Sequence, residues 1–225
     1  TISEADADDL SINTTTGNKQ WRPDASGLAD GGFVVVWNSQ DQDGSDIGVF
    51  GQRFNADGES VGDEFQVNTT TDNRQYRPTV TGLADGGFVV AWEGQGSDGN
   101  NGIYSQHFDA DGAPTGVEVR VGDGGGQRPV VTELTDGDYV IVWQNGDNSD
   151  WGVYGQRYNA DGTASGTQFL INSTTNSSQQ HPEVTALADG GFVVAWQSNN
   201  QDGSGWGIYG QRFDADGFTV GDEFM

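Results

Sequence analysis

Four Asp-rich loops carry the side chains of this sequence that are best suited to bind a metal ion. The first, residues 41–46 (DQDGSD), alternates carboxylates around a glycine that permits a sharp turn. Hard cations such as Ca²⁺ take about six to eight oxygen ligands, and such loops supply them. The alternative is a solvated turn without an ion. The sequence therefore predicts calcium as the cofactor, with the ligands Asp41, Asp43, Asp46, Asp98, Asp147, Asp150 and Asp202.

A second set of candidate residues is aromatic or cationic. Some of them vary just before a recurring proline, and others occur in only two of the Asp-rich loops. Positions that vary among otherwise similar units are not demanded by the fold, and an aromatic ring beside polar groups can stack on a sugar. An adjacent arginine can hold a carboxylate or sulfate. The predicted ligand-binding residues are Trp21, Arg22, Tyr76, Arg77, Trp151, His181 and Trp206.

Composition excludes several classes of function. The 225 residues include 9 basic and 34 acidic side chains, so the net charge of −25 argues against nucleic acid and anionic membranes as partners. Cysteine is absent, which excludes disulfides and thiolate chemistry. No apolar run is long enough for membrane insertion. The 36 glycines and a single methionine favour many short strands joined by tight turns.

The elements that position these side chains come from an internal repeat. The sequence GLADGGFVVVW at 27–37 returns with small changes at 82–92, 133–143 and 186–196. Each unit predicts four strands, and the second has apolar residues on both faces, as a central strand does. A later turn, such as NADG at 55–58, is explained by local hydrogen bonding of Asn and by a positive φ at Gly.

Four-stranded units that recur about every 50 residues are typical of propeller blades. We predict an all-β, four-bladed β-propeller, with a linear β-repeat array or a β-sandwich as the alternative. The chain is one repeat domain, 1–225, with units at about 18–68, 73–122, 127–172 and 179–225. Residues 9–23 resemble 63–78, so 1–17 are expected to form a closing strand in the last blade, where the C-terminal strand competes for the same place.

The repeated motifs GGFVVAW, IYGQRFDADG and VGDEF resemble tandem repeats of very large secreted bacterial proteins of the RTX and adhesin type. The resemblance covers nearly the whole chain, and it implies type I secretion, an extracellular or cell-surface location, folding in calcium and flanking repeats in a larger chain. The glycine-rich nonapeptide that defines RTX calcium rolls is absent, so its calcium sites do not carry over.

Two functional hypotheses follow, and neither is enzymatic. The first is a secreted, calcium-supported, multivalent carbohydrate-binding module, lectin-like or adhesin-like, whose partner is an extracellular glycan or polysaccharide. The second is a calcium-rigidified structural spacer without a ligand. A polysaccharide-degrading enzyme ranks third, because the sequence lacks the common catalytic motifs. Its one lead is the second unit, where Glu93 replaces Asn or Gln and His107 replaces Arg.

Overall fold

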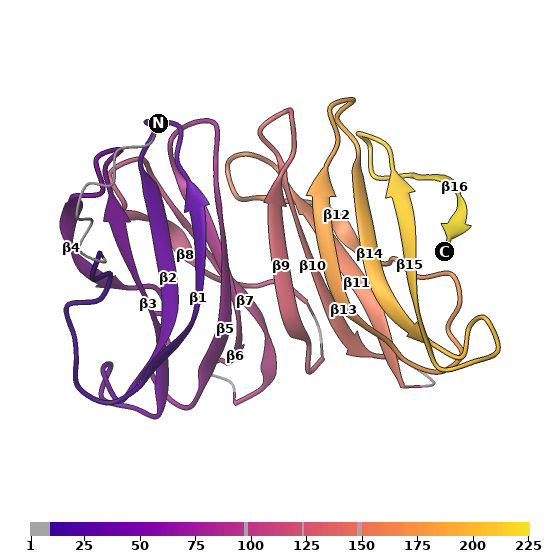
Figure 1. Ribbon diagram of the computed structural model, residues 1–225, viewed down its shortest axis with the longest axis horizontal. Coiled ribbons are helices and arrows are strands. Elements are labelled where there is room, and N and C mark those ends of the chain that lie inside the picture. The colour runs from indigo at the N-terminus through magenta and orange to yellow at the C-terminus, as the bar shows by residue number, and fades with distance from the viewer. Residues whose placement is uncertain (1–9, 97–98, 123, 148–149) are drawn as a thin grey trace, which may run out of the picture.

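The computed structural model describes residues 10–96, 99–122, 124–147 and 150–225 and contains sixteen strands. They form four antiparallel four-stranded sheets, here called blades 1 to 4 (Figure 1). The strands of blade 1 are β1 (Gln20–Gly27), β2 (Phe33–Gln40), β3 (Ile47–Phe54) and β4 (Ser60–Gln66), and those of blade 2 are β5 (Gln75–Gly82), β6 (Phe88–Gln95), β7 (Asn101–Phe108) and β8 (Pro114–Arg120). Blade 3 holds β9 (Gln127–Glu133), β10 (Tyr139–Gly146), β11 (Trp151–Tyr158) and β12 (Ala164–Leu170), and blade 4 holds β13 (Gln179–Ala186), β14 (Phe192–Asn199), β15 (Trp206–Phe213) and β16 (Thr219–Phe224).

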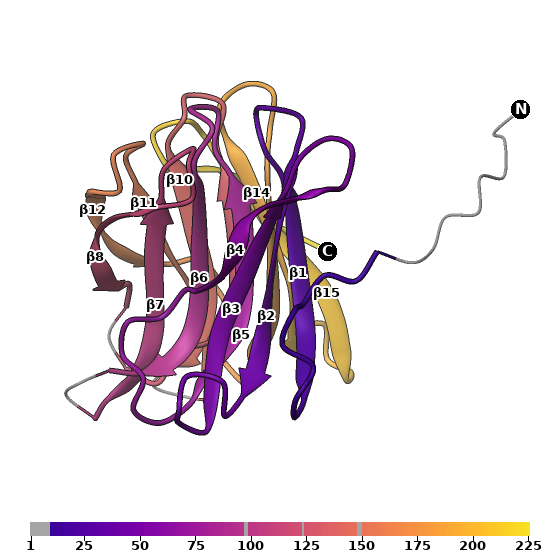
Figure 2. The same ribbon diagram turned by 90° about the vertical axis from the view of Figure 1, so that its left-hand side faces the viewer.

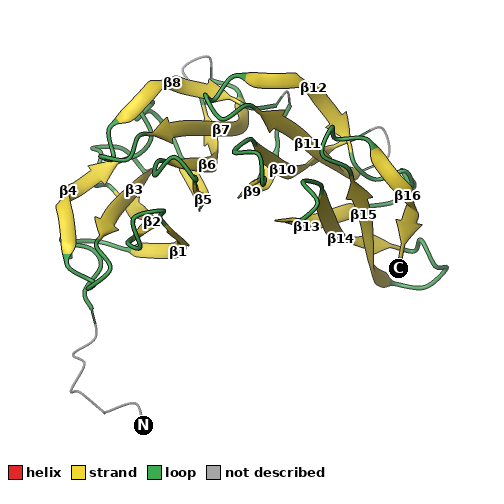
Figure 3. Cartoon of the chain, turned by 90° about the horizontal axis from the view of Figure 1, so that it is seen from above, coloured by secondary structure: helices red, strands yellow, loops and turns green. Residues whose placement is uncertain are grey.

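The blades stand side by side around one axis, with β1, β5, β9 and β13 as the innermost strands (Figure 3). Each inner strand contacts the next one along the chain. The all-β fold and the four propeller blades are therefore confirmed, and each predicted unit contains one blade. The ring does not close: the blades form an arc, and no comparable contact joins β13 to β1 among the described residues.

The first hairpin of blade 1 depends on glycine because the turn between β3 and β4 lies against it. A Cβ on Gly32 would lie 2.3 Å from the carbonyl oxygen of Phe54, and Gly31 has φ +86°. The Asp30 carboxylate accepts the Gly32 N–H at 2.8 Å. The repeated LADGG sequence therefore fixes a tight hairpin that ends β1 and starts the central strand β2.

Apolar side chains of adjacent blades interlock to form the core. The recurring tryptophans of the central strands, Trp37, Trp92, Trp143 and Trp196, are all buried. One cluster packs Val34 and Val49 of blade 1 against Val80 and Phe88 of blade 2, and similar clusters join blades 2 and 3 and blades 3 and 4. A blade is thus stabilised mainly by its neighbours, which is the behaviour expected of repeat units.

Among the described residues, no further blade packs against the face of blade 4 that points away from blade 3, here called its outer face. Val49, Ile103 and Val153 occupy one position of the repeat and are fully buried, each at 0% exposure. The corresponding residue of blade 4, Ile208, is 62% exposed. Residues at the same position of the repeat therefore lie in the core of blades 1 to 3 and at the surface of blade 4.

The N-terminal segment covers the outer face of blade 1 and is not a closing strand. Residues 10–19 run beside blade 1 before they enter β1 (Figure 2). Ile12 packs against the cluster that contains Trp37, and the Thr14 N–H donates to Glu64 Oε2 at 2.7 Å. The outer position of blade 4 belongs to β16. The expected closing strand is therefore wrong for residues 10–17, and residues 1–9 lie outside the described part.

The repeated Gln-Arg pairs are structural elements within each blade. Gln52 Nε2 donates to the carbonyl oxygens of Arg53 at 2.9 Å and Val61 at 3.2 Å, so it bridges the irregularity where β3 pairs with β4. The glutamine therefore serves backbone groups of its own blade. The arginines pair with carboxylates of a neighbouring turn, as Arg53 does with Asp30 at 3.6 Å.

Candidate functional site

The inner strand of every blade carries the same irregular step. A register shift separates Trp21 from Asp24 in β1, and corresponding shifts occur in β5, β9 and β13. At each step the residue before the proline has the left-handed backbone conformation, which side chains other than glycine rarely adopt and which is further disfavoured before proline. The four residues and their φ angles are Arg22 (55°), Arg77 (52°), Arg128 (54°) and His181 (57°).

Side chains of the preceding blade hold three of these steps in place. The backbone N–H of Arg77 donates to Asn38 Oδ1 at 3.1 Å, and that of His181 donates to Gln144 Oε1 at 3.0 Å. Glu93 plays the same part, since its Oε1 accepts the N–H of Arg128 at 2.7 Å. Left-handed residues persist where their surroundings determine the conformation, and they concentrate at binding sites. The repeat therefore maintains this step at every junction between blades.

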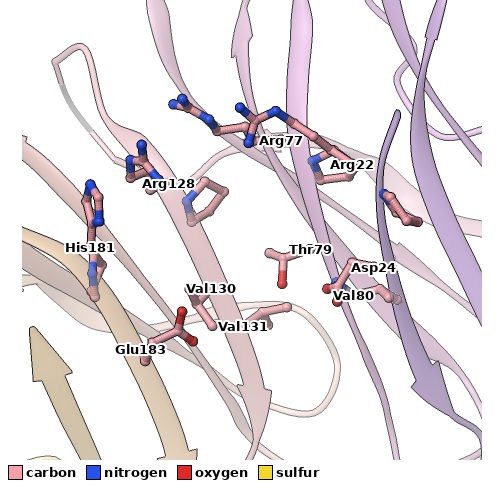
Figure 4. Close-up of a pocket in the computed structure, with 14 residues that line it drawn as sticks. Arg22, Asp24, Arg77, Thr79, Val80, Arg128, Val130, Val131, His181 and Glu183 are labelled. Atoms are coloured by element: carbon pink, nitrogen blue, oxygen red, sulfur yellow. The ribbon is translucent and has the colours of Figure 1, made fainter. Parts of the chain in front are cut away.

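The four steps line one trough on the inner face of the arc, with a volume of about 580 Å³. Arg22, Arg77, Arg128 and His181 form one row along it (Figure 4). The residues two positions later form a second row, which is Asp24, Thr79, Val130 and Glu183. The trough thus presents a cationic row beside a row that has a carboxylate at each end.

The two carboxylates of the trough differ in their hydrogen bonding. Asp24 Oδ2 accepts the backbone N–H of Val80 at 2.8 Å, so the first blade's carboxylate is fixed against the second blade. Glu183 is exposed, and within the described residues its carboxylate has neither a hydrogen bond nor an ion pair. Because the two come from the first and fourth blades, only the curvature of the arc brings them to one trough.

Three arginines surround the ring of Tyr76. The guanidinium carbons of Arg22, Arg74 and Arg77 lie 4.9, 5.1 and 5.2 Å from its centroid. Arg22 Nε also donates to the Tyr76 hydroxyl at 3.1 Å, and Trp21 packs on Tyr76 with 6.4 Å between ring centroids. Burial by itself raises the pKa of Tyr76, but the hydrogen bonds from Arg22 and Trp21 and the charges of Arg22 and Arg77 outweigh it and lower that pKa.

The pKa of the His181 imidazole is lowered, first by burial and then by the positive charges of Arg128 and Arg77. Its ordinary value is about 6.5, so His181 is expected to be neutral at pH 7 and to gain its proton only in more acidic solution. Replacing Arg128 by Met removes one repelling charge and should raise this pKa. An NMR titration of the imidazole signals measures the change.

His107 is an internal control for that titration, because the chain has only two histidines. Burial lowers the pKa of His107 too, while the charges of Asp85, Asp109 and Asp161 raise it. Arg128 does not contribute there, so Arg128→Met should leave His107 unchanged. Equal shifts of both histidines, or no shift of His181, would contradict this arrangement of charges.

The structure brings together only part of the predicted ligand-binding set. Trp21, Arg22, Tyr76, Arg77 and His181 lie in or beside the trough. Trp151 and Trp206 do not line it: they begin β11 and β15, which are third strands of their blades, away from the inner strand.

The recurring prolines show which residues of the four units correspond to one another. His181 corresponds to Arg22 and Arg77, because all of these immediately precede the proline, whereas Trp21 and Tyr76 precede it by two. The residue of the third unit at this position is Arg128, which precedes Pro129. Asp24 and Glu183 occupy the position just after the proline. Arg128, Asp24 and Glu183 are therefore three residues of the trough that are absent from the predicted ligand-binding set.

The described residues of the Asp-rich loops bond mainly within their own turns. Asp43 Oδ1 accepts the Ser45 N–H at 3.0 Å, and Asp202 Oδ1 accepts the Ser204 N–H at 2.9 Å. Asp46 pairs with Arg74 at 3.7 Å, Asp147 accepts the N–H of Asp150 at 2.8 Å, and Asp41 has a left-handed backbone. Asp98 lies outside the described residues.

No group of three His, Cys, Asp or Glu side chains that could hold a metal ion occurs in the described part of the chain. Calcium binding by these loops, like secretion and the adhesin relationship, stays a prediction. None of the described residues forms a helix that is long and apolar enough to cross a membrane.

The unusual pair of the second unit, Glu93 and His107, does not form a site. Glu93 Oε1 accepts a hydrogen bond from Arg77 Nη1 at 2.7 Å and takes the structural place of Asn38 and Gln144. The His107 imidazole contacts Thr115 at the opposite end of the β6–β7 ladder. Glu93 is therefore a positioning residue that holds two arginines of the trough.

Comparison with known proteins identifies the fold. No family model matches the sequence, and a search of curated proteins finds no match. Among solved structures, the chain is similar to an α-L-arabinanase from Penicillium chrysogenum, with a TM-score of 0.63 and 15% identity over 92% of this chain and 67% of that one. A GH43_1 enzyme from Xanthomonas citri gives 0.55 and 14%, over 92% and 75%. A Hadza microbial sialidase gives 0.59 and 12%, over 88% of this chain and 45% of the sialidase.

These similarities overturn two expectations. The chain was expected to be a lectin-like module and not an enzyme, but the solved chains that share its blade arrangement are described as an arabinanase, a GH43 enzyme and a sialidase. The prediction relied on the absence of local catalytic motifs. A propeller assembles its inner face from separate blades, so no local motif is needed. Below 25% identity the likeness itself shows only the fold.

Proposed function

We propose that this protein hydrolyses glycosidic bonds in a polysaccharide that lies along the trough. The observation that carries the proposal is the pair of carboxylates, Asp24 and Glu183, at the two ends of one row of side chains in a trough large enough for sugar units. Solved structures with this fold that are described as an arabinanase and a sialidase support a carbohydrate substrate.

Glycoside hydrolysis requires one carboxyl group as an acid and a second carboxylate as a base or nucleophile. Glu183, whose carboxyl group has no protein partner among the described residues, is assigned the acid. It gives its proton to the leaving glycosidic oxygen as the bond from that oxygen to the anomeric carbon breaks. Asp24 keeps one oxygen on the Val80 N–H and uses its carboxylate to take a proton from the attacking water. The new bond joins the water oxygen to the anomeric carbon.

The experiment is a screen of neutral and acidic plant, microbial and animal polysaccharides for release of reducing ends. Wild-type protein is incubated with each polysaccharide across a range of acidic and neutral pH, and oligosaccharide products are identified by mass spectrometry. We expect one class of polysaccharide to be cleaved by wild-type protein. The Asp24→Asn, Glu183→Gln double variant is expected to leave it intact. Equal release by the double variant, or no cleavage of any polysaccharide, would overturn the proposal.

A further inference from the structure

Four of the nine basic side chains of a protein with net charge −25 lie in or beside the trough. Arg22, Arg74 and Arg77 surround Tyr76, and Arg128 is close enough for the charges of Arg22 and Arg77 to act on it. Burial, followed by the charge of Arg77, lowers the pKa of the Arg128 guanidinium, while Glu93 opposes this effect. Positive charges that repel one another in a strongly acidic protein are stabilised when an anion lies between them.

Three arginines that do not line the trough have carboxylate partners. Arg53, Arg157 and Arg212 each pair with an aspartate of a neighbouring turn. By contrast, neither Arg22 nor Arg128 has a carboxylate partner within the described ranges, and the Arg128 guanidinium has no protein hydrogen bond there. Arg77 pairs with Glu93 through Nη1. Guanidinium donors that line the trough are thus left for a ligand.

The backbone at these residues indicates that their placement is not incidental. Arg22 has a φ of 55° although no blade precedes it within the described residues to hold the step, and Arg77 and Arg128 have nearly the same angle. The left-handed step places each arginine in one row while the residue two positions later lies in the other (Figure 4). An anionic group on the cationic row would leave the rest of its sugar beside Asp24 and Glu183.

We infer that the substrate is an acidic polysaccharide and that the trough recognises the carboxylate of a uronic acid unit through Arg22, Arg77 and Arg128. A planar carboxylate matches the paired N–H donors of a guanidinium, which bind it by two parallel hydrogen bonds. A sulfate ester on a neutral sugar would offer the same charge without the planar geometry. This inference rests on the proposed function for the polymer that the trough holds, but carboxylate recognition is measured as binding, apart from turnover.

Isothermal titration calorimetry tests the inference with the Glu183→Gln variant, so that cleavage does not interfere. The probes are three tetrasaccharides, made of glucuronic acid, of glucose, and of glucose that carries sulfate esters. The glucuronic acid tetrasaccharide should bind most tightly. Adding Arg128→Met should weaken its binding about tenfold or more, because hydrogen bonds to charged groups are among the stronger ones. The Arg128 side chain has no protein partner to lose in the described structure, so the variant is expected to fold.

Arg212→Met is the matched control, since it removes one positive charge from an arginine that pairs with Asp189 outside the trough. It should leave the binding of the glucuronic acid tetrasaccharide within about twofold of the parent, because exposed charges away from the ligand are screened. Equal binding of the glucose and glucuronic acid probes would overturn the inference and leave hydrolysis intact. Tighter binding of the sulfated probe would overturn carboxylate recognition. Carboxylate-specific binding by a protein that cleaves nothing would uphold recognition and overturn the proposed hydrolysis.

Discussion

Glu183→Gln and Asp24→Asn are each expected to lower the rate of polysaccharide cleavage by about 10²- to 10⁴-fold, the range that a positioned acid or base contributes. Gln cannot give a proton to the leaving oxygen, and Asn cannot take one from water. Each replacement keeps the size of the side chain, and in Asp24→Asn the amide oxygen of the new side chain can still accept the Val80 N–H. The measurement is kcat for the polysaccharide identified in the screen.

Asp57→Asn is the control for these two variants. Asp57 lies in the turn between β3 and β4, where Asn55 makes the hydrogen bonds that shape the turn. The change removes one carboxylate and should leave the rate unaltered. Thermal melts of all three variants check that each is folded. Full activity in a folded Glu183→Gln protein would exclude Glu183 as the acid.

Ile103→Ala should lower the free energy of unfolding by about 2–5 kcal/mol, whereas Ile208→Ala should change it by no more than about 0.5 kcal/mol. The two isoleucines occupy the same position of the repeat, but Ile103 packs against blade 3 and Ile208 faces solvent. Truncating a buried side chain to Ala removes the favourable free energy of transferring its apolar atoms from water to the core, and it also leaves a cavity. Urea unfolding measures both changes in one protein.

This pair of variants tests the open arc directly. If the outer face of blade 4 were covered in solution, Ile208→Ala would cost as much as Ile103→Ala. Sedimentation at the concentration used for unfolding gives the mass of the particle and serves as the control. A large cost at Ile208 in a monomeric protein would contradict the arrangement of the blades.

The blades could be predicted from the sequence because each is specified locally. The spacing from one proline to its tryptophan is constant, and the tight hairpin between them needs the positive-φ glycine that every unit supplies, such as Gly31. Tryptophans shared by all units belong to the core, and Trp92 and Trp143 are fully buried. These sequence signals all lie within one repeat unit of about fifty residues.

The site could not be predicted in the same way because it depends on the arc. Asp24 and Glu183 lie at opposite ends of the chain, and only the curvature of four blades gives them a common trough. Arg22 and Arg128 enter the trough through the left-handed step, which the following proline disfavours at both residues. At Arg128 the step is held by a hydrogen bond from Glu93 of the preceding blade. Local conformational preferences therefore predict the wrong backbone conformation at these residues.

The Asp-rich loops show why the calcium prediction cannot be decided from spacing. Their composition is that of a calcium loop, but a turn uses the same residues, because a carboxylate can accept an N–H two positions later in its own loop. Asp43 and Asp202 do so. Spacing alone does not separate the two uses, since the choice depends on whether several carboxylates converge on one point.

The most direct test of the central claim is a crystal structure of the Glu183→Gln protein with a bound acidic oligosaccharide. The account predicts that the sugar chain lies along the trough, with a glycosidic oxygen beside residue 183 and a carboxylate on Arg22, Arg77 or Arg128. A sugar bound elsewhere, for example on the exposed ring of Trp206, with the trough empty, would contradict it.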